Sequence, residues 1–202
     1  MKTLLAATLA VATLAAPGLS RAATYELDPA HTSASFSVRH LMVTNVRGEF
    51  GKVVGTVEYD EKEPTKAKVE ATIDVSSITT RDEKRDNHLK SPDFFDAAKY
   101  PNITFKSKKV EKSAKGLRVV GDFTIRGVTK EVVLDVEGPT KEIKDPWGNA
   151  KVGAAATTKI NRQDYGVKWN KSLDGGGVVV GDEVAIHVDV EMLKKPAAEA
   201  KH

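Results

Sequence analysis

Apolar and polar residues alternate strictly along several long segments of this chain, and that period of two is typical of antiparallel β-strands. Between residues 117 and 126, Leu117, Val119 and Phe123 fall on one face, while charged and hydroxyl side chains fall on the other. Such a pattern indicates strands with one buried face and one face in water. The same alternation occurs in four further segments, 68–75, 103–108, 131–136 and 183–192.

Turn-forming residues separate these segments and set the expected topology. Clusters of Gly, Pro, Asp and Asn follow most of the alternating runs, and the Arg126–Thr129 link is short enough for a hairpin. No strand alternates with a long helix, which argues against a parallel sheet. Eight or nine successive strands with short links predict an all-β protein, either a sandwich or an up-and-down barrel. Less regular strands are expected at 25–27, 33–40, 50–59 and 150–160.

One stretch between the strands is predicted to be helical. Thr80–Glu83 matches a capping box, which would open a short helix through about Lys90. Ser91 and Pro92 then begin a further turn, which carries two adjacent phenylalanines and ends at Pro101. The two rings need a buried environment. The insert is therefore either a plug in the end of a barrel or a lid over a cavity, and one insert can be both.

Residues 1–22 have the layout of a secretory signal peptide. Lys2 precedes a thirteen-residue apolar run, and Ser20 and Ala22 occupy the −3 and −1 positions for cleavage. As a helix, such a run spans about 20 Å, short of the ~30 Å hydrocarbon core of a bilayer. We therefore expect a protein that is exported from the cytoplasm by a cleaved signal peptide and has no stable membrane anchor. Residues 23–193 form its domain, and 194–202 form a polar tail.

Composition and motifs exclude several functional classes. The chain has no cysteine, so it has no disulfide, thiolate nucleophile or Cys-ligated metal site. Lys and Arg number 31 against 28 Asp and Glu, too small an excess to indicate nucleic-acid binding. Neither a G-x-S-x-G elbow, nor H-E-x-x-H, nor a phosphate-binding loop is present. Because the histidines follow no common metal-ligand spacing, we expect no enzyme, no metal and no cofactor.

The predicted interior suggests a ligand class. An eight-stranded barrel is just wide enough to be filled by its side chains or to hold one small ligand. Ala71, Gly121, Ala154 and Ala156 are expected to point inward and leave volume among Val, Ile and Phe. Such a space suits a long apolar chain, whose burial yields about 0.8 kcal/mol per CH₂. The alternative, that neighbouring phenylalanines fill the space, stays open.

Short motifs in a fixed order carry a resemblance to a known family. Between residues 24 and 193 the chain closely resembles the YceI-like family of exported, lipocalin-like polyisoprenoid-binding proteins. The motifs are YELDPAH (25–31), FSVRHL (36–41), VRGEFG (46–51), the insert with RD at 81–82, HL at 88–89 and FFD at 94–96, YPNITF (100–105), GDFTIRGVT (121–129) and NRQDYG (161–166).

The resemblance implies a fold, a location and a class of ligand. The expected fold is an extended eight-stranded antiparallel lipocalin-like barrel around an apolar tunnel, with the short helical insert near residues 80–99. The expected ligand is a long-chain isoprenoid or acyl lipid, including isoprenoid-quinone-like molecules, held in the periplasm. Members are often dimers. Whether binding serves transport, storage or protection against stress stays open.

The expected site has two parts. Apolar tunnel residues would take up the chain, and residues at the mouth would bind a head group or gate entry. The alternatives are ordinary barrel core for the first set and structural hydrogen bonds to backbone for the second. Two rival functions also stay open: a lipid-modifying or metal-assisted hydrolase at the mouth, and a scaffold with a filled barrel that binds a partner protein. The tunnel set is Phe36, Val38, Val69, Ile73, Phe105, Phe123, Ile125, Ile160 and Ile186, and the mouth set is His31, His40, Arg81, His88, Phe94, Phe95 and Arg162.

Overall fold

The computed structural model describes residues 22–196, in which one antiparallel sheet closes into a barrel. Residues 1–21 of the predicted leader and residues 197–202 of the tail lie outside this range. None of the helices in residues 22–196 is long and apolar enough to cross a membrane. The strands are β1 (Ala23–Leu27), β2 (Ser33–His40), β3 (Thr44–Phe50), β4 (Val53–Tyr59), β5 (Lys68–Asp74), β6 (Ile78–Thr79), β7 (Asn102–Ser113), β8 (Gly116–Ile125), β9 (Val128–Glu137), β10 (Ile143–Lys144), β11 (Ala150–Asn161) and β12 (Val180–Lys194).

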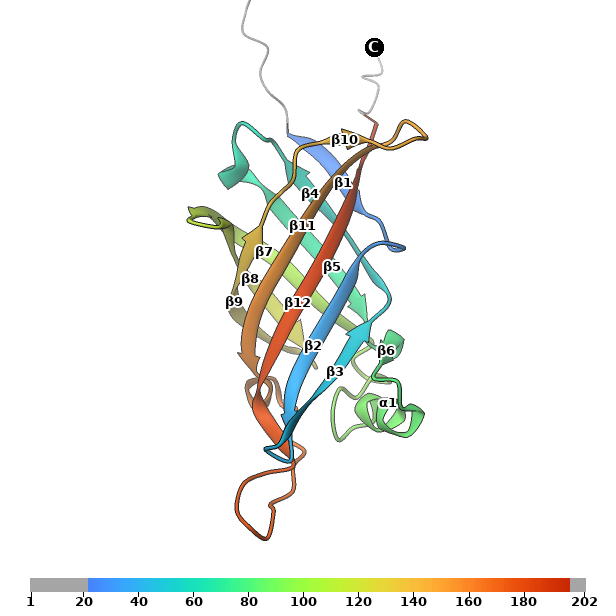
Figure 1. Cartoon of the computed structure of the whole chain (residues 1–202), viewed down its shortest axis with the longest axis vertical. Coiled ribbons are helices and arrows are strands. Elements are labelled where there is room, and N and C mark those ends of the chain that lie inside the picture. Colours follow the sequence, from blue (N-terminus) through green and yellow to red (C-terminus); the bar gives the residue numbers. More distant parts are fainter. Residues whose placement is uncertain (1–21, 197–202) are drawn as a thin grey trace, which may run out of the picture.

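Eight strands form the closed ring: β1, β4, β5, β7, β8, β9, β11 and β12. The strand β12 is long enough to pair with two strands along one edge: with β1 over residues 192–194 and with β2 over residues 180–189. The strands β2 and β3 therefore extend the wall beyond β1 and β4. Figure 1 shows an elongated barrel with β10 at one end and the helix α1 (Glu83–Lys90) at the other. We call these the β10 end and the helix end. The predicted eight-stranded antiparallel barrel is confirmed.

Large side chains pack closely in the part of the barrel nearer the β10 end. Tyr25, Leu27 and Met192 are buried together there, and Ala71 and Ala154 pack against them. Ala71 and Ala154 therefore make room for large neighbours. Gly121 behaves in the same way, because a Cβ at this position would lie 2.5 Å from the ring of Phe105. None of Ala71, Gly121, Ala154 and Ala156 lines the cavity at the helix end, so the expectation that they leave volume for a ligand there was wrong.

Tyr25 and Tyr165 make the stability of the barrel sensitive to alkaline pH. Burial, followed by the hydrogen bond to Glu142 and the charge of Glu142, raises the pKa of Tyr25 to about 12. Burial likewise raises the pKa of Tyr165 to about 12, with a smaller contribution from the charge of Asp164. An unfolded tyrosine titrates near pH 10, so the native state holds these protons more tightly than the unfolded chain does.

The stabilisation is thus complete below about pH 10 and is lost as the pH rises towards 12. We expect the free energy of unfolding to fall by about 1–3 kcal/mol per tyrosine across this range. Urea denaturation at a series of pH values measures it. The double variant Tyr25→Phe, Tyr165→Phe should show a shallower decline than the wild type, and an unchanged decline would contradict the assignment.

The helical insert starts later than its sequence motif suggests. The N-cap of α1 is Asp82, whose carboxylate accepts a hydrogen bond from the Arg85 amide at 3.0 Å, so the prediction of Thr80 as the cap was wrong. Arg81 is left-handed, with φ 64°, and this separates Thr80 from the helix. The Thr80 amide donates instead to the Asp86 carboxylate at 2.7 Å. Beyond Lys90 the chain continues in turns up to the start of β7.

Candidate ligand cavity

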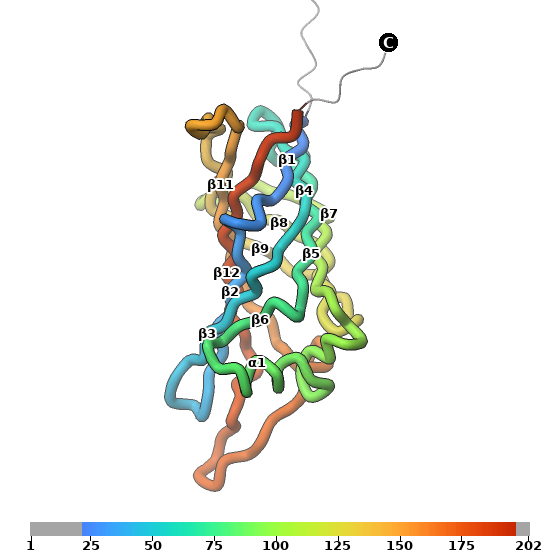
Figure 2. The backbone as a smooth tube through the Cα atoms, turned by 90° about the vertical axis from the view of Figure 1, so that its right-hand side faces the viewer, coloured from blue at the N-terminus to red at the C-terminus, as the bar shows by residue number. Residues whose placement is uncertain are grey.

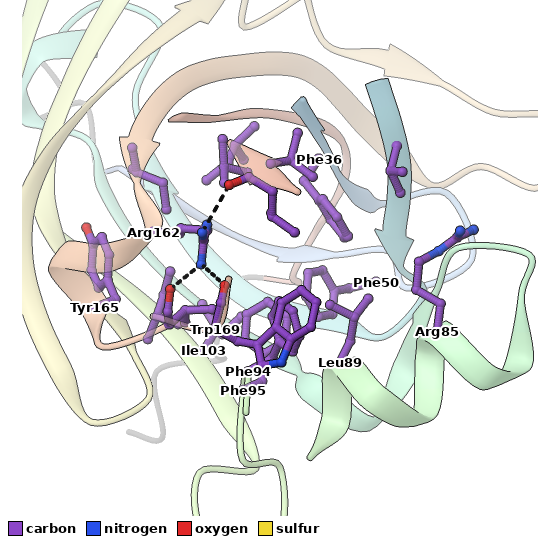
Figure 3. A pocket seen from close by; sticks show the side chains of 18 of the residues that line it. Phe36, Phe50, Arg85, Leu89, Phe94, Phe95, Ile103, Arg162, Tyr165 and Trp169 are labelled. Carbon is purple, nitrogen blue, oxygen red and sulfur yellow. Dashed lines mark hydrogen bonds between the residues drawn. The ribbon is translucent and has the colours of Figure 1, made fainter. Parts of the chain in front are cut away.

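A cavity of about 480 Å³ lies inside the barrel at the helix end. Its size falls within the ~300–1,000 Å³ typical of small-molecule sites. Strands β2, β3, β8 and β12 contribute much of the wall, and α1 with the turns after it closes part of the end (Figure 3). The wall is mainly apolar, and its apolar members are Ala34, Phe36, Val38, Val46, Phe50, Ile73, Leu89, Phe94, Phe95, Ile103, Phe123, Ile125, Ile160, Tyr165, Val167, Trp169, Val179, Val180, Val184 and Ile186.

Most of the predicted tunnel residues lie in this wall. Val69 and Phe105 are the exceptions: Val69 packs against the buried clusters, and the ring of Phe105 covers Gly121. These two positions therefore match the alternative of ordinary barrel core. For the wall residues, contact with a ligand stays a prediction. The predicted residues in the wall are Phe36, Val38, Ile73, Phe123, Ile125, Ile160 and Ile186.

Three rings meet at the helix end of the cavity. The ring centroid of His88 lies 5.0 Å from that of Phe94 and 5.1 Å from that of Trp169, and the last two are 5.3 Å apart. The His88 Nε2 atom also lies 2.8 Å from the carboxylate of Asp93. Phe94 is buried, whereas Phe95 is partly buried and packs edge-on against Phe50. The insert therefore both plugs the barrel and forms cavity wall.

Trp169 is a wall residue that the sequence analysis missed. It lies in the connection between the 3-10 helix η3 (Arg162–Tyr165) and β12, outside every alternating segment. Periodicity gives no information about such a connection. The available signal was composition, since Trp169 is one of only two tryptophans in the chain.

Charged side chains lie on the part of the lining that β2, α1 and the N-cap of α1 contribute. Arg39, Lys84 and Arg85 contribute cations, and Asp82 contributes one carboxylate. The Arg85 Nε atom donates to the Thr80 hydroxyl at 2.8 Å, which holds this side chain in place. An apolar wall beside more cations than anions suits an amphiphile with a polar or anionic head group.

Of the predicted mouth residues, His40, His88, Phe94, Phe95 and Arg162 line the cavity, and His31 and Arg81 do not. The expectation that His31 and Arg81 lie at the mouth was wrong. His31 lies in the turn between β1 and β2, where Nδ1 is 2.9 Å from the carboxylate of Asp28. Arg81 is exposed before α1.

Arg162 is buried, and its guanidinium is fully used within the protein. It donates to the backbone carbonyls of Val167 at 2.6 Å, Trp169 at 2.9 Å and Val180 at 3.2 Å (Figure 3). It also donates to the Gly181 carbonyl at 2.8 Å and to the Asp182 carboxylate at 3.3 Å. Burial lowers the pKa of this guanidinium, although arginine stays charged in proteins. These bonds tie the connection after η3 to β12 and thereby position Trp169. They match the structural alternative rather than binding of a head group.

A separate charged cluster lies outside the cavity lining. A carboxylate oxygen of Asp28, a ring nitrogen of His31 and a carboxylate oxygen of Glu191, all atom types that bind metal ions, lie within 4.8 Å of one another. The Lys151 ammonium is 2.5 Å from the Glu191 carboxylate and 3.8 Å from that of Asp28. The hydrogen bond to Glu191 raises the pKa of Lys151, so this lysine already supplies the positive charge that the carboxylates need.

Comparison with known proteins agrees with this architecture. A model of the YceI-like domain matches residues 25–192. A UPF0312 protein of Staphylococcus aureus (strain MSSA476) is 42% identical over 169 residues, covering 83% of this chain and 95% of that protein.

Solved structures share the fold. Burkholderia cenocepacia BcnA aligns with a TM-score of 0.69 at 25% identity, over 82% of this chain and 98% of BcnA. The Campylobacter jejuni YCEI protein aligns with a TM-score of 0.64 at 32% identity, over 78% of this chain and 90% of that one. A polyisoprenoid binding domain from Saccharophagus degradans has the same fold, with a TM-score of 0.62 at 13% identity, over 87% of this chain and 100% of that domain. Because the domain model covers most of its length, the chain belongs to the YceI-like family.

Proposed function

We propose that this protein is an exported binding protein that holds a long-chain apolar lipid, of polyisoprenoid or isoprenoid-quinone type, in the cavity at the helix end. The observation that carries the proposal is the mainly apolar wall of a cavity of about 480 Å³. Membership of the YceI-like family supports it, as does the fold shared with a domain described as polyisoprenoid binding. The signal-peptide pattern of residues 1–22 supports a periplasmic location.

The energetics of such binding rest on the apolar wall. Each methylene moved from water into the cavity contributes about 0.8 kcal/mol, so a chain needs few polar contacts to bind. Arg39, Lys84 and Arg85 lie where they can approach the head group, while Arg162 is occupied by the backbone. We infer that the polar end of the ligand lies near β2 and α1 and that the apolar end points into the barrel.

We also infer binding rather than catalysis. His40 and His88 are the predicted mouth histidines that line the cavity, and the ring of His88 is held by Asp93, Phe94 and Trp169. A carboxylate partner also orients catalytic histidines, so the inference rests on the mainly apolar lining around His88 rather than on the Asp93 contact. Turnover of a labelled isoprenoid lipid by the purified protein would contradict this inference.

Protein purified from its own periplasm should carry its ligand. We expect native mass spectrometry to show one polyprenyl or long-acyl species per chain, lost on organic extraction and regained when the extract is returned. The protein mass in the same spectrum should correspond to a chain that begins at Ala23. The same spectrum would also show the dimer that the family resemblance implies. A ligand-free protein that also ignores a panel of isoprenoid lipids would contradict carriage and support the filled-barrel scaffold.

A further inference from the structure

Three consecutive large apolar residues are exposed at the tip of the hairpin between β2 and β3. Leu41 is 39% exposed, Met42 50% and Val43 73%. The Val43 amide donates to the His40 carbonyl at 3.1 Å, which closes a turn with Leu41 and Met42 at its centre. We call residues 41–43 the apolar tip.

The backbone of this turn makes its apolar side chains unusual. Leu41 has φ 49° and Met42 has φ 61°, so both central residues are left-handed. Hairpin turns of this kind strongly favour Asn-Gly, and a bulky residue in this region is uncommon. The apolar tip therefore has large side chains in water at positions where the local geometry favours small or polar ones. A role in contacting an apolar partner accounts for this choice.

The apolar tip lies beside the cavity. The Leu41 amide donates to the Val179 carbonyl at 2.8 Å, and Gly177 lies against the Met42 side chain. His40 and Val179, which flank these contacts, both line the cavity. Figures 1 and 2 show the hairpin and the connection before β12 projecting at the same end as α1.

The surroundings of the apolar tip carry an excess of positive charge. Arg39 precedes the tip, and Lys168 and Lys171 lie in the neighbouring connection 167–179, which has Asp174 as its one carboxylate. All four of these side chains are exposed. Within residues 22–196, neither of these lysines forms an ion pair with a carboxylate. A cationic surface around an exposed apolar loop complements an anionic bilayer.

We propose that the apolar tip and its flanking cations dock this protein on a bilayer surface that contains anionic phospholipid, with the cavity facing the membrane. Apolar side chains would enter the boundary between head groups and acyl chains, and Arg39, Lys168 and Lys171 would lie among the anionic head groups. Docking itself requires only these residues. Its use, direct exchange of a lipid between membrane and cavity, rests on the proposed function.

Since the chain has no cysteine, single thiol labels can test which end meets the membrane. Val43→Cys labels the apolar tip. Trp147→Cys is the matched control, because Trp147 is 81% exposed in the turn beside β10 at the opposite end. The full chain is expressed with its residues 1–22, the form that the cell produces is purified, and each variant receives an environment-sensitive thiol dye.

Vesicles of equal parts phosphatidylethanolamine and phosphatidylglycerol are then added. We expect the emission to shift to the blue for Val43→Cys and to stay constant for Trp147→Cys. Pure phosphatidylcholine vesicles, or 0.5 M salt with the anionic vesicles, should weaken the shift because the cations then contribute little. Absence of a shift at Val43→Cys, or a larger shift at Trp147→Cys, would overturn the proposal.

A second variant preserves the turn and removes its apolar surface. Leu41→Asn with Met42→Gly installs the pair that this turn favours, so the barrel should fold and the cavity should keep its lipid affinity. Vesicle flotation should show at least about tenfold weaker binding to the anionic vesicles. Wild-type binding by this variant would overturn docking through the tip.

Size-exclusion chromatography distinguishes the competing partner of the tip, a second copy of this chain. If the variant is monomeric where the wild type is a dimer, the tip is an interface between copies and the membrane proposal fails.

Lipid affinity measured without vesicles separates this proposal from the proposed function. Retained lipid uptake without docking rejects the membrane contact alone, and loss of lipid uptake with intact docking rejects the carrier.

Discussion

Replacing Arg162 with methionine should lower the free energy of unfolding by about 3–5 kcal/mol, because several backbone carbonyls lose their donor at once. The guanidinium satisfies four backbone carbonyls, those of Val167, Trp169, Val180 and Gly181. A buried acceptor left without a donor costs about 1–3 kcal/mol, partly recovered where water can enter. Methionine keeps much of the aliphatic volume, so the loss reports mainly on the hydrogen bonds. Urea denaturation measures it.

Arg118→Met is the matched control. The Nε atom of Arg118 lies 3.5 Å from the Asp135 carboxylate, and both side chains are largely exposed. An exposed pair of this kind contributes at most about 1 kcal/mol. Hydrogen exchange should also quicken across residues 167–180 in Arg162→Met, where the connection loses its attachment. Equal loss of stability in the two variants would show that the bonds of Arg162 contribute no more than a surface ion pair.

Filling the cavity should abolish most ligand binding while the barrel stays folded. Val38 on β2 and Val184 on β12 are direct cross-strand partners, and both line the cavity. Val38→Trp with Val184→Phe places two rings in the space that the chain would occupy. Excluding two methylenes at about 0.8 kcal/mol each already corresponds to a loss of more than about tenfold in affinity. Titration of delipidated protein with the extracted ligand measures the loss.

The control for this variant carries its tryptophan on the outside of the barrel. Val54 on β4 is 52% exposed and does not line the cavity, so Val54→Trp should bind like the wild type. Urea denaturation of the filled variant checks that its core is intact, because rings placed in an existing cavity cause less strain than rings forced into a packed core. If the filled variant binds as tightly as Val54→Trp, the ligand lies outside this cavity.

Phe36 and Phe105 show how far the alternating pattern can predict a site. Both residues point into the barrel, as their period predicts, but Phe36 lines the cavity and Phe105 packs over Gly121. A period of two specifies which face of a strand is buried. It carries no information about height along the barrel axis, which depends on how the strands are staggered against one another.

His31 and His40 show the same limit for polar residues. They are nine positions apart in the sequence, yet His31 contacts Asp28 while His40 lines the cavity. Extended chain rises about 3.3 Å per residue, so β2, whose eight residues lead from the turn of His31 to His40, covers roughly 26 Å. We expected both at one mouth, whereas strand geometry separates them along the length of the barrel.

The residue pattern alone specifies the antiparallel strands, the turns between them and the helical insert, because these depend on side-chain alternation and local turn chemistry. The order of the short motifs adds the family and, with it, the closed barrel. The position of the cavity at the helix end, the closure by Trp169 and the backbone-binding role of Arg162 depend on residues far apart in the chain. Such contacts arise only when staggered strands bring distant segments to the same height, and no local pattern records that stagger.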